Sequence, residues 1–156
     1  MFDRVLVVCV GNVCRSPMAA GLLRARLGGR AGAPVIDSAG VAALVGAAPD
    51  PLAVKLLRER EIDISGHRAV QLSYQVLRRA PLILAMEAVQ QRWIVDQWPE
   101  AQGRVQLLGR WGRFEVPDPL GGTEQEFRDC LGLIEVGVAE WCERVAQSGL
   151  PSREDR

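Results

Sequence analysis

The amino-acid sequence predicts an α/β fold, in which a doubly wound, four-stranded parallel sheet carries helices on both faces. Short runs of β-branched and apolar residues alternate with segments of helical spacing along the chain. Continuous apolar runs are typical of strands that are buried on both faces of a parallel sheet. Right-handed crossovers between such strands place the connecting helices on both sides of the sheet.

The first predicted unit is a strand, a loop and a helix. Residues 5–9 form a continuous apolar run and are predicted as the first strand. Ser16 is predicted as a helix N-cap and Pro17 as the first residue of a helix that continues over residues 18–27. In a doubly wound sheet the functional site lies at the carboxyl ends of the strands, so the loop of residues 9–16 is the first place to look.

The remaining elements follow in order. Strands are predicted over residues 35–37, 81–85 and 105–108, and helices from Asp50-Pro51 to about residue 60 and over residues 87–98. A Pro- and Gly-rich loop covers residues 116–122. The last helix opens with a capping box of Thr123 and Glu126, and its apolar face consists of Phe127, Leu131, Ile134, Val138, Trp141 and Val145. We expect one domain over residues 1–156, with a loose polar tail from about residue 147.

The composition argues against several kinds of partner. The chain of 156 residues has 19 Lys and Arg and 19 Asp and Glu, so its formal charge is zero, which argues against nucleic acid and against attraction to a membrane surface. No apolar run reaches the roughly 18 residues of a membrane span, and the first residues do not form a secretory signal. We therefore expect a cytoplasmic protein without membrane insertion, in which the four cysteines are free thiols.

The loop of residues 9–16 carries the residues that indicate chemistry, and it reads Cys-Val-Gly-Asn-Val-Cys-Arg-Ser. Backbone N–H groups of a tight loop at a helix N-terminus form an anion cradle, and an arginine adds a planar fork for two phosphoryl oxygens. The residues expected to bind phosphate are Val10, Gly11, Asn12, Val13, Cys14 and Arg15. The same positive field favours a thiolate at Cys9, which can then act as a nucleophile.

These residues resemble the phosphate loop of the low-molecular-weight protein tyrosine phosphatases, and the resemblance extends over nearly the whole chain. Asp118-Pro119 is similar to the general-acid signature of that family. The resemblance implies that Asn12, Ser16, Ser38 and His67 support the phosphate loop. Residues 38–46, with Pro49-Asp50, are similar to the bacterial branch that serves tyrosine autokinases of capsule and exopolysaccharide export. The implied partner is a phosphotyrosine-containing protein, such as a bacterial tyrosine autokinase.

The resemblance also implies a mechanism in two steps. Cys9 attacks phosphorus and forms a phosphocysteine, while Arg15 and the loop N–H groups bind the oxygens. Asp118 protonates the leaving phenolate and then activates the water that hydrolyses the phosphocysteine. No cofactor and no metal is expected, because Arg15 and the loop neutralise the charge on phosphate.

Three other functions fit these residues less well. A thiol-dependent arsenate reductase of the same fold relays a disulfide through cysteines after the third strand, and residues 82–92 contain none. A protein arginine phosphatase is a nearer alternative, but those relatives have Thr where this chain has Val13, and an apolar residue there favours an aryl substrate. A catalytically silent phosphotyrosine-binding module is disfavoured because Cys9, Arg15 and Asp118 are all present.

Several residues have a simpler interpretation. Asp118-Pro119 is also a common turn sequence. Cys130 and Cys142 lie on or beside the apolar face of the last helix and are expected to be core thiols. Cys14 is assigned a redox role as a thiol that can trap oxidised Cys9 as a disulfide. Two further residues depart from the family pattern at the walls of the aryl pocket: Leu44, where eukaryotic members usually carry an aromatic, and Leu120, where many members have Tyr.

Overall fold

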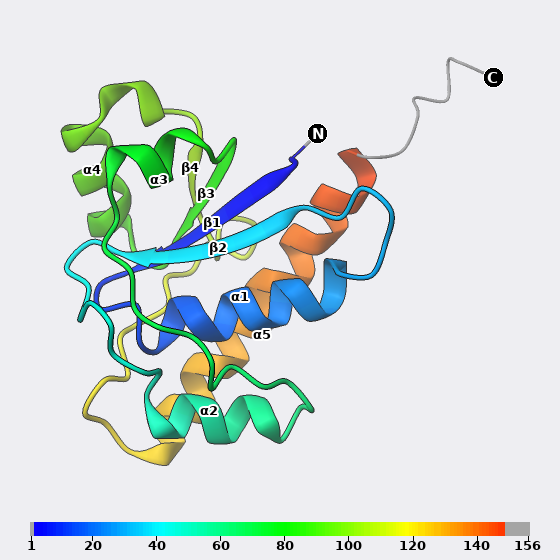
Figure 1. Cartoon of the computed structure of the whole chain (residues 1–156), viewed down its shortest axis with the longest axis vertical. Helices are drawn as coiled ribbons and strands as arrows, with labels where there is room; N and C mark the ends of the chain where they lie inside the picture. Colours follow the sequence, from blue (N-terminus) through cyan, green and yellow to red (C-terminus); the bar gives the residue numbers. More distant parts are fainter. Residues whose placement is uncertain (1, 149–156) are drawn as a thin grey trace.

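The structure is a computed structural model that describes residues 2–148. Four parallel strands form one sheet in the order β2-β1-β3-β4, and helices cover both of its faces (Figure 1). The strands are β1 (Arg4–Cys9), β2 (Val35–Gly40), β3 (Leu82–Ala85) and β4 (Val105–Leu107). The predicted fold class is confirmed. The chain turns from β1 to β2 on one side and then continues at β3 on the other, so the ends of β1 and β3 border the topological switch point.

Alternate residues of β1 enter two separate cores. Val5 and Val7 belong to the larger cluster, and Leu6 and Val8 belong to the smaller one. The larger core is completed by α1 (Arg15–Leu27), α2 (Pro51–Arg58) and α5 (Glu124–Ser148), and the smaller one by α3 (Tyr74–Arg78), α4 (Ala88–Gln97) and the short 3₁₀ helix η1 (Pro99–Ala101). This burial on both faces explains why the strand is apolar at every position from Val5 to Cys9.

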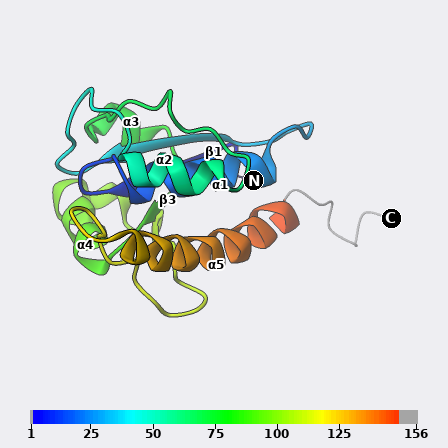
Figure 2. The same cartoon turned by 90° about the horizontal axis from the view of Figure 1, so that it is seen from below.

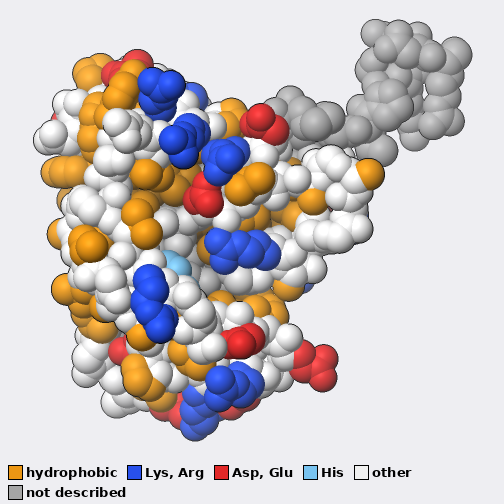
Figure 3. Space-filling view, in the orientation of Figure 1, with side chains coloured by type: hydrophobic (Ala, Val, Ile, Leu, Met, Phe, Trp, Pro, Cys, Tyr) orange, Lys and Arg blue, Asp and Glu red, His pale blue; other side chains and the backbone are white. Residues whose placement is uncertain are grey.

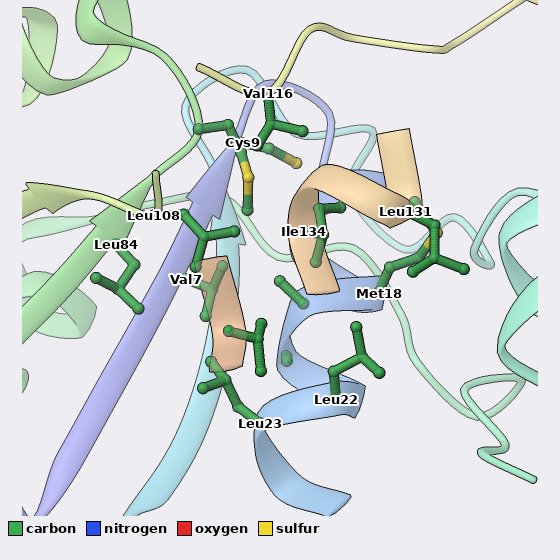
Figure 4. Close-up of a cluster of buried hydrophobic side chains, with 14 of the residues drawn as sticks. Val7, Cys9, Met18, Leu22, Leu23, Leu84, Leu108, Val116, Leu131 and Ile134 are labelled. Atoms are coloured by element: carbon green, nitrogen blue, oxygen red, sulfur yellow. The ribbon is translucent and has the colours of Figure 1, made fainter. Parts of the chain in front are cut away.

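The end of β1 lies on the larger core, where α5 runs along α1 (Figure 2). In Figure 4, Val7 and Leu84 of the sheet face Met18 and Leu22 of α1 and Ile134 of α5. These side chains are almost fully buried. Cys9 and Val116 lie at one end of this cluster. Cys9, the last residue of β1, is therefore held in place by the packing of the larger core.

The start of α1 differs from the prediction. The helix begins at Arg15, the N-cap position is Cys14, and no side chain caps the helix. The assignment of Ser16 as N-cap is therefore wrong, because its hydroxyl contacts Cys9 and Asn12 instead. Pro17 is the third helical residue, where its missing N–H still costs no intrahelical hydrogen bond.

The other elements agree with the prediction within a few residues, except that α3 and η1 were not predicted. The helix α3 is only five residues long, and the Ser73 side chain caps it. The helix α5 continues to Ser148, and the predicted loose tail lies almost entirely outside the described residues. The N–H group of Glu126 donates to Thr123 Oγ1 at 3.2 Å, as in the predicted capping box. Among residues 2–148, no helix is both long and apolar enough to span a membrane.

Candidate active site

The phosphate loop (residues 9–16) follows β1, and its carbonyl groups point away from its centre. Groups outside the loop donate to five successive carbonyl oxygens, at 2.8–3.1 Å. The pairs, donor first, are Val41 to Cys9, Ala42 to Val10, Leu44 to Gly11, His67 Nε2 to Asn12 and Asp50 to Val13. Within the described residues, no acceptor is assigned to the N–H groups of residues 10–14. The peptide planes are thus oriented so that these N–H groups line the inside of the loop, which is the geometry of an anion cradle.

Asn12 holds the loop in this conformation. Its φ angle is 60°, in the left-handed region that asparagine tolerates better than most residues. Its amide oxygen accepts from the N–H of Val70 at 2.9 Å, and its Nδ2 donates to Ser16 Oγ at 2.7 Å and to Ser38 Oγ at 3.0 Å. The side chain is completely buried, and its hydrogen bond to Ser16 is buried with it.

Cys9 lies within hydrogen-bond distance of a hydroxyl group. Its Sγ is 2.9 Å from Ser16 Oγ. Ser16 Oγ also accepts from the Asn12 amide. A thiolate, the nucleophilic form of cysteine, can only accept a hydrogen bond, and the Ser16 hydroxyl is positioned to donate to it.

The other three thiols are held in the protonated form. All four cysteines are free and buried. Burial raises the pKa of Cys14 far above its ordinary range, and Asp50 and Asp118 add to the effect. Burial also raises the pKa of Cys130 to about 12 and raises that of Cys142. These three thiols are therefore poor nucleophiles at neutral pH.

Arg15 is held by two groups from the carboxyl edge of the sheet. Its guanidinium is 1% exposed, and Nη1 donates to Glu87 Oε1 at 2.5 Å and to the Val116 carbonyl at 2.9 Å. Glu87 follows β3 and Val116 follows β4, so the switch point of the sheet brings them to the loop after β1. Because Nη1 is occupied by protein, Nη2 and Nε are the groups that remain for a ligand.

Asp118 approaches the same guanidinium from the loop of residues 116–122. Its Oδ2 is 3.5 Å from Arg15 Nη2, and its Oδ1 accepts from the N–H of Leu120 at 3.1 Å. The carboxylate is 40% exposed. The phosphate loop, with Cys9 and Arg15, and the separate loop that carries Asp118 thus meet at one edge of the sheet.

His67 contacts the phosphate loop from outside. A carbonyl oxygen can only accept a hydrogen bond, so the contact to the Asn12 carbonyl fixes the proton on Nε2. Burial lowers the pKa of His67, and Arg24 and Arg68 lower it further, against the effect of the Asn12 contact. The neutral ring is thus favoured at neutral pH.

Glycine is required at Gly40 rather than at Gly11. A Cβ atom on Gly40 would lie 2.4 Å from the Val10 carbonyl oxygen, far inside van der Waals contact. A Cβ atom on Gly11 would meet only Val13 and Leu44 side chains, at 3.6 Å or more. The end of β2 can therefore approach the loop only because residue 40 has no side chain.

Sequence reasoning missed Glu87, which makes the shortest contact to Arg15. Its position directly after the third strand was the available signal, because all strand ends of a parallel sheet meet at one edge. Gln90 was also missed; its Oε1 accepts from the N–H groups of Met86 and Glu87, and its Nε2 donates to Glu87 Oε1 at 3.2 Å.

A cysteine at the base of an anion cradle, with an arginine and a carboxylic acid beside it, suits an enzyme that transfers a phosphoryl group through a thiol. Comparison with known proteins agrees. The family described as "Low molecular weight phosphotyrosine protein phosphatase" matches residues 4–150. The chain belongs to this family of protein-tyrosine phosphatases.

Three relatives illustrate the similarity. A probable low molecular weight protein-tyrosine-phosphatase, EpsP of Ralstonia solanacearum, is 42% identical over 149 residues, which cover 96% of this chain and 100% of the relative. The crystal structure of the tyrosine phosphatase Wzb from Escherichia coli K30 in complex with sulphate has a TM-score of 0.87 at 34% identity, covering 93% of this chain and 99% of that one. The arginine phosphatase YwlE from Geobacillus stearothermophilus has a TM-score of 0.85 at 32% identity, covering 93% and 94%.

Proposed function

We propose that this chain hydrolyses phosphotyrosine in proteins through a phosphocysteine intermediate on Cys9. The observation that carries the proposal is the orientation of the phosphate loop, whose carbonyl groups are bonded from outside while Cys9 lies at its base. The oxygens of a phosphate dianion in the loop accept hydrogen bonds from the inward N–H groups of residues 10–14 and from Nη2 and Nε of Arg15. No cofactor or metal is needed for this binding.

In the first step the Cys9 thiolate attacks phosphorus in line with the departing phenolate oxygen. An S–P bond forms and the P–O bond to the tyrosyl ring breaks. Asp118 gives its proton to the phenolate, a general-acid role that is worth roughly 10² to 10⁴ in rate. Charge on the equatorial oxygens is stabilised by Arg15 and the loop N–H groups.

In the second step water attacks the phosphocysteine. Asp118, now a carboxylate, takes a proton from that water, the S–P bond breaks, and inorganic phosphate leaves. The Ser16 hydroxyl, 2.9 Å from Cys9 Sγ, stabilises the thiolate that is released. The same contact therefore serves the nucleophile of the first step and the leaving group of the second.

Asp118 and the substrate compete for Arg15. In the free protein Asp118 Oδ2 lies 3.5 Å from Arg15 Nη2. A phosphate bound in the loop takes over Nη2, so Asp118 is released from this contact when the substrate binds.

An aryl substrate is favoured over phosphoarginine, although the arginine phosphatase YwlE is similar in fold. Val13 is almost fully buried, and its Cγ2 is 3.6 Å from the position of a Cβ on Gly11. An apolar floor offers no hydrogen-bond partner to a guanidinium. Arsenate reduction is disfavoured because residues 82–92 lack the relay thiols.

For the partner, we propose a bacterial tyrosine autokinase of capsule or exopolysaccharide export. The similarity of residues 38–50 to the branch that serves such kinases supports this. The curated relatives named EpsP and Wzb are both low molecular weight protein-tyrosine phosphatases of bacteria. We expect the reaction to take place in the cytoplasm.

The decisive experiment compares phosphate release from phosphotyrosine, phosphoserine and phosphoarginine peptides. Phosphotyrosine alone should be hydrolysed, and Cys9→Ser should abolish turnover while it still binds vanadate. Cys142→Ser is the matched control, because Cys142 is also a buried free thiol but lies near the C-terminal end of α5. This variant should retain activity. Turnover by correctly folded Cys9→Ser would refute the covalent mechanism.

The role of Asp118 is tested with a series of aryl phosphates. Asp118→Asn should lose roughly 10² to 10⁴ in kcat for poor leaving groups and much less for good ones, because only poor leaving groups need the proton. An equal loss across the series would assign the acid to another residue.

A further inference from the structure

Large hydrophobic side chains are concentrated beside the phosphate loop. Eleven such side chains are exposed in the described part of the chain, and four of them lie in the loop or on two segments that are hydrogen-bonded to it. We call these four the apolar rim: Val10 (37% exposed), Leu44 (53%), Val45 (72%) and Val70 (45%). Contiguous exposed apolar surface of this kind marks a binding surface, whereas single exposed residues do not.

Hydrogen bonds join the rim to the phosphate loop. The N–H of Leu44 donates to the Gly11 carbonyl, and the N–H of Val70 donates to Asn12 Oδ1. The Leu44 side chain lies against the loop, with its Cγ 3.8 Å from the position of a Cβ on Gly11. The rim is therefore continuous with the anion cradle.

The backbone of the rim is held rigidly. The Gln71 side chain accepts from the N–H of Ala43 and donates to the Val41 carbonyl, both at 2.9 Å. Ala69 exchanges two further hydrogen bonds, with the N–H of Gly46 and with the Ala47 carbonyl. A surface that is already ordered loses little conformational entropy when a partner binds.

The rim is also without charge. Residues 38–49 and 69–77 contain no charged side chain. Arg68 is the nearest cation in sequence, and its guanidinium donates to the carbonyls of Ser65 and His67. In Figure 3, hydrophobic side chains line the left edge, where the segment between β2 and α2 lies in Figure 1. The rim segments therefore offer no charge of their own to a partner, and they favour contact with apolar side chains.

We propose that the apolar rim binds the residues next to phosphotyrosine in the substrate and selects for branched apolar side chains at those positions. The proposal rests on the proposed function of the loop. When the phosphate occupies the loop, the tyrosyl ring extends out of it, and the neighbouring residues of the substrate meet the surface around the loop. Apolar side chains there bury surface against Val45 and Val70, which is favourable in proportion to the area removed from water.

The test uses two phosphotyrosine peptides of equal length and net charge, one with Val and Leu and the other with Ser on both sides of the phosphotyrosine. The wild-type protein should hydrolyse the apolar peptide with about tenfold higher kcat/KM, and Val45→Ser should remove about fivefold of this preference. Turnover of para-nitrophenyl phosphate, which does not extend to Val45, should stay within about twofold of wild type. Val136→Ser is the matched control, because Val136 is 48% exposed on α5, and it should leave the preference unchanged.

The outcomes distinguish the role of the rim in substrate selection from the proposed activity of the phosphate loop. Equal kcat/KM for the two peptides would overturn the role of the rim and leave the phosphatase intact. A preference that survives in a Val45→Ser, Val70→Ser double variant would also overturn it. Failure to hydrolyse either peptide, with para-nitrophenyl phosphate still turned over, would refute the proposed function itself.

Discussion

Removing the carboxylate of Glu87 should lower both stability and turnover through one contact. Glu87 Oε1 is 2.5 Å from Nη1 of an arginine that is 1% exposed, while the Glu87 side chain itself is 30% exposed. Breaking a hydrogen bond to a buried charged group costs about 1.5–3 kcal/mol. Arg15 keeps the Val116 carbonyl and the more distant Asp118, so we expect Glu87→Ala to lose about 2 kcal/mol. In a chain of this length that corresponds to about 4–8 °C in Tm.

The same variant should separate kcat from KM. Without Glu87 the guanidinium is less restrained but carries more uncompensated positive charge, so phosphate binding is retained while the alignment of the transferring group is lost. We expect kcat for para-nitrophenyl phosphate to fall about tenfold with KM not raised, and Glu87→Asp to recover part of the loss. Vanadate binding should raise the Tm of the variant more than that of wild type, because the anion restores a partner to Arg15.

The measurements are thermal unfolding with and without vanadate, and steady-state kinetics. Glu135→Ala is the matched control, because Glu135 forms an ion pair with Arg60 at the surface, and such pairs contribute little. A Glu87→Ala protein with wild-type Tm and kcat would refute the argument that this carboxylate positions Arg15. A lower Tm with an unchanged kcat would mean that Glu87 stabilises the fold but does not position Arg15 for turnover.

Two further predictions concern the loop itself. Val13→Thr should raise the ratio of phosphoarginine to phosphotyrosine turnover, measured as kcat/KM in competition, because a hydroxyl offers the guanidinium a polar partner; an unchanged ratio removes Val13 from the account of specificity. After peroxide oxidises Cys9 to the sulfenic acid, attack by Cys14 should release water and form a disulfide that dithiothreitol reverses, whereas Cys14→Ser should accumulate sulfinic and sulfonic Cys9 by mass spectrometry. Because burial raises the pKa of Cys14, formation of this disulfide should become faster as the pH rises. Equal recovery of both proteins after matched exposure would exclude a protective role of Cys14.

The fold was predictable because its signals are local. The apolar run of β1 predicts burial on both faces of the sheet, and the apolar face of α5 predicts burial on one side of the helix. The structure shows both patterns, with alternate residues of β1 in two cores. The short helix α3 could not be predicted, because five residues are too few to show a helical period of apolar residues. Ser16 was misassigned because a serine before a proline is a helix-start signal, and nothing local reveals that its hydroxyl is taken by Cys9 and Asn12.

The site was predictable only in part, for the same reason. Cys9 and Arg15 share one loop, so their spacing is legible in the sequence. Glu87 and the Val116 carbonyl reach Arg15 from 72 and 101 residues away, and only the order of strands in the sheet brings them there. The contacts that orient the proposed catalytic groups thus depend on the topology of the sheet, which no single segment of the sequence reveals.

The pH dependence of stability should report the contact between His67 and the phosphate loop. Burial lowers the pKa of His67 below its ordinary value of 6.5, so as pH falls the unfolded chain takes up the proton before the folded one does. Folding is therefore weakened as pH falls from about 6.5 toward the folded pKa, and above about 6.5 there is no such loss. His67→Gln should lack this part of the decline, measured as the free energy of unfolding in urea at a series of pH values.

His67 is the only histidine in the chain, so NMR can follow its titration without overlap. Linkage requires the measured pKa and the slope of stability against pH to agree, since both report the same proton. A His67 pKa at or above 6.5 in the folded protein would contradict the argument from burial. A folded pKa below 6.5, with the same decline in His67→Gln as in wild type, would show that other groups govern acid stability. The expected result, a lowered pKa together with a flatter profile in the variant, would mean that the neutral ring, with its proton on Nε2, is the form that holds the Asn12 carbonyl and thereby keeps the neighbouring N–H groups directed into the loop.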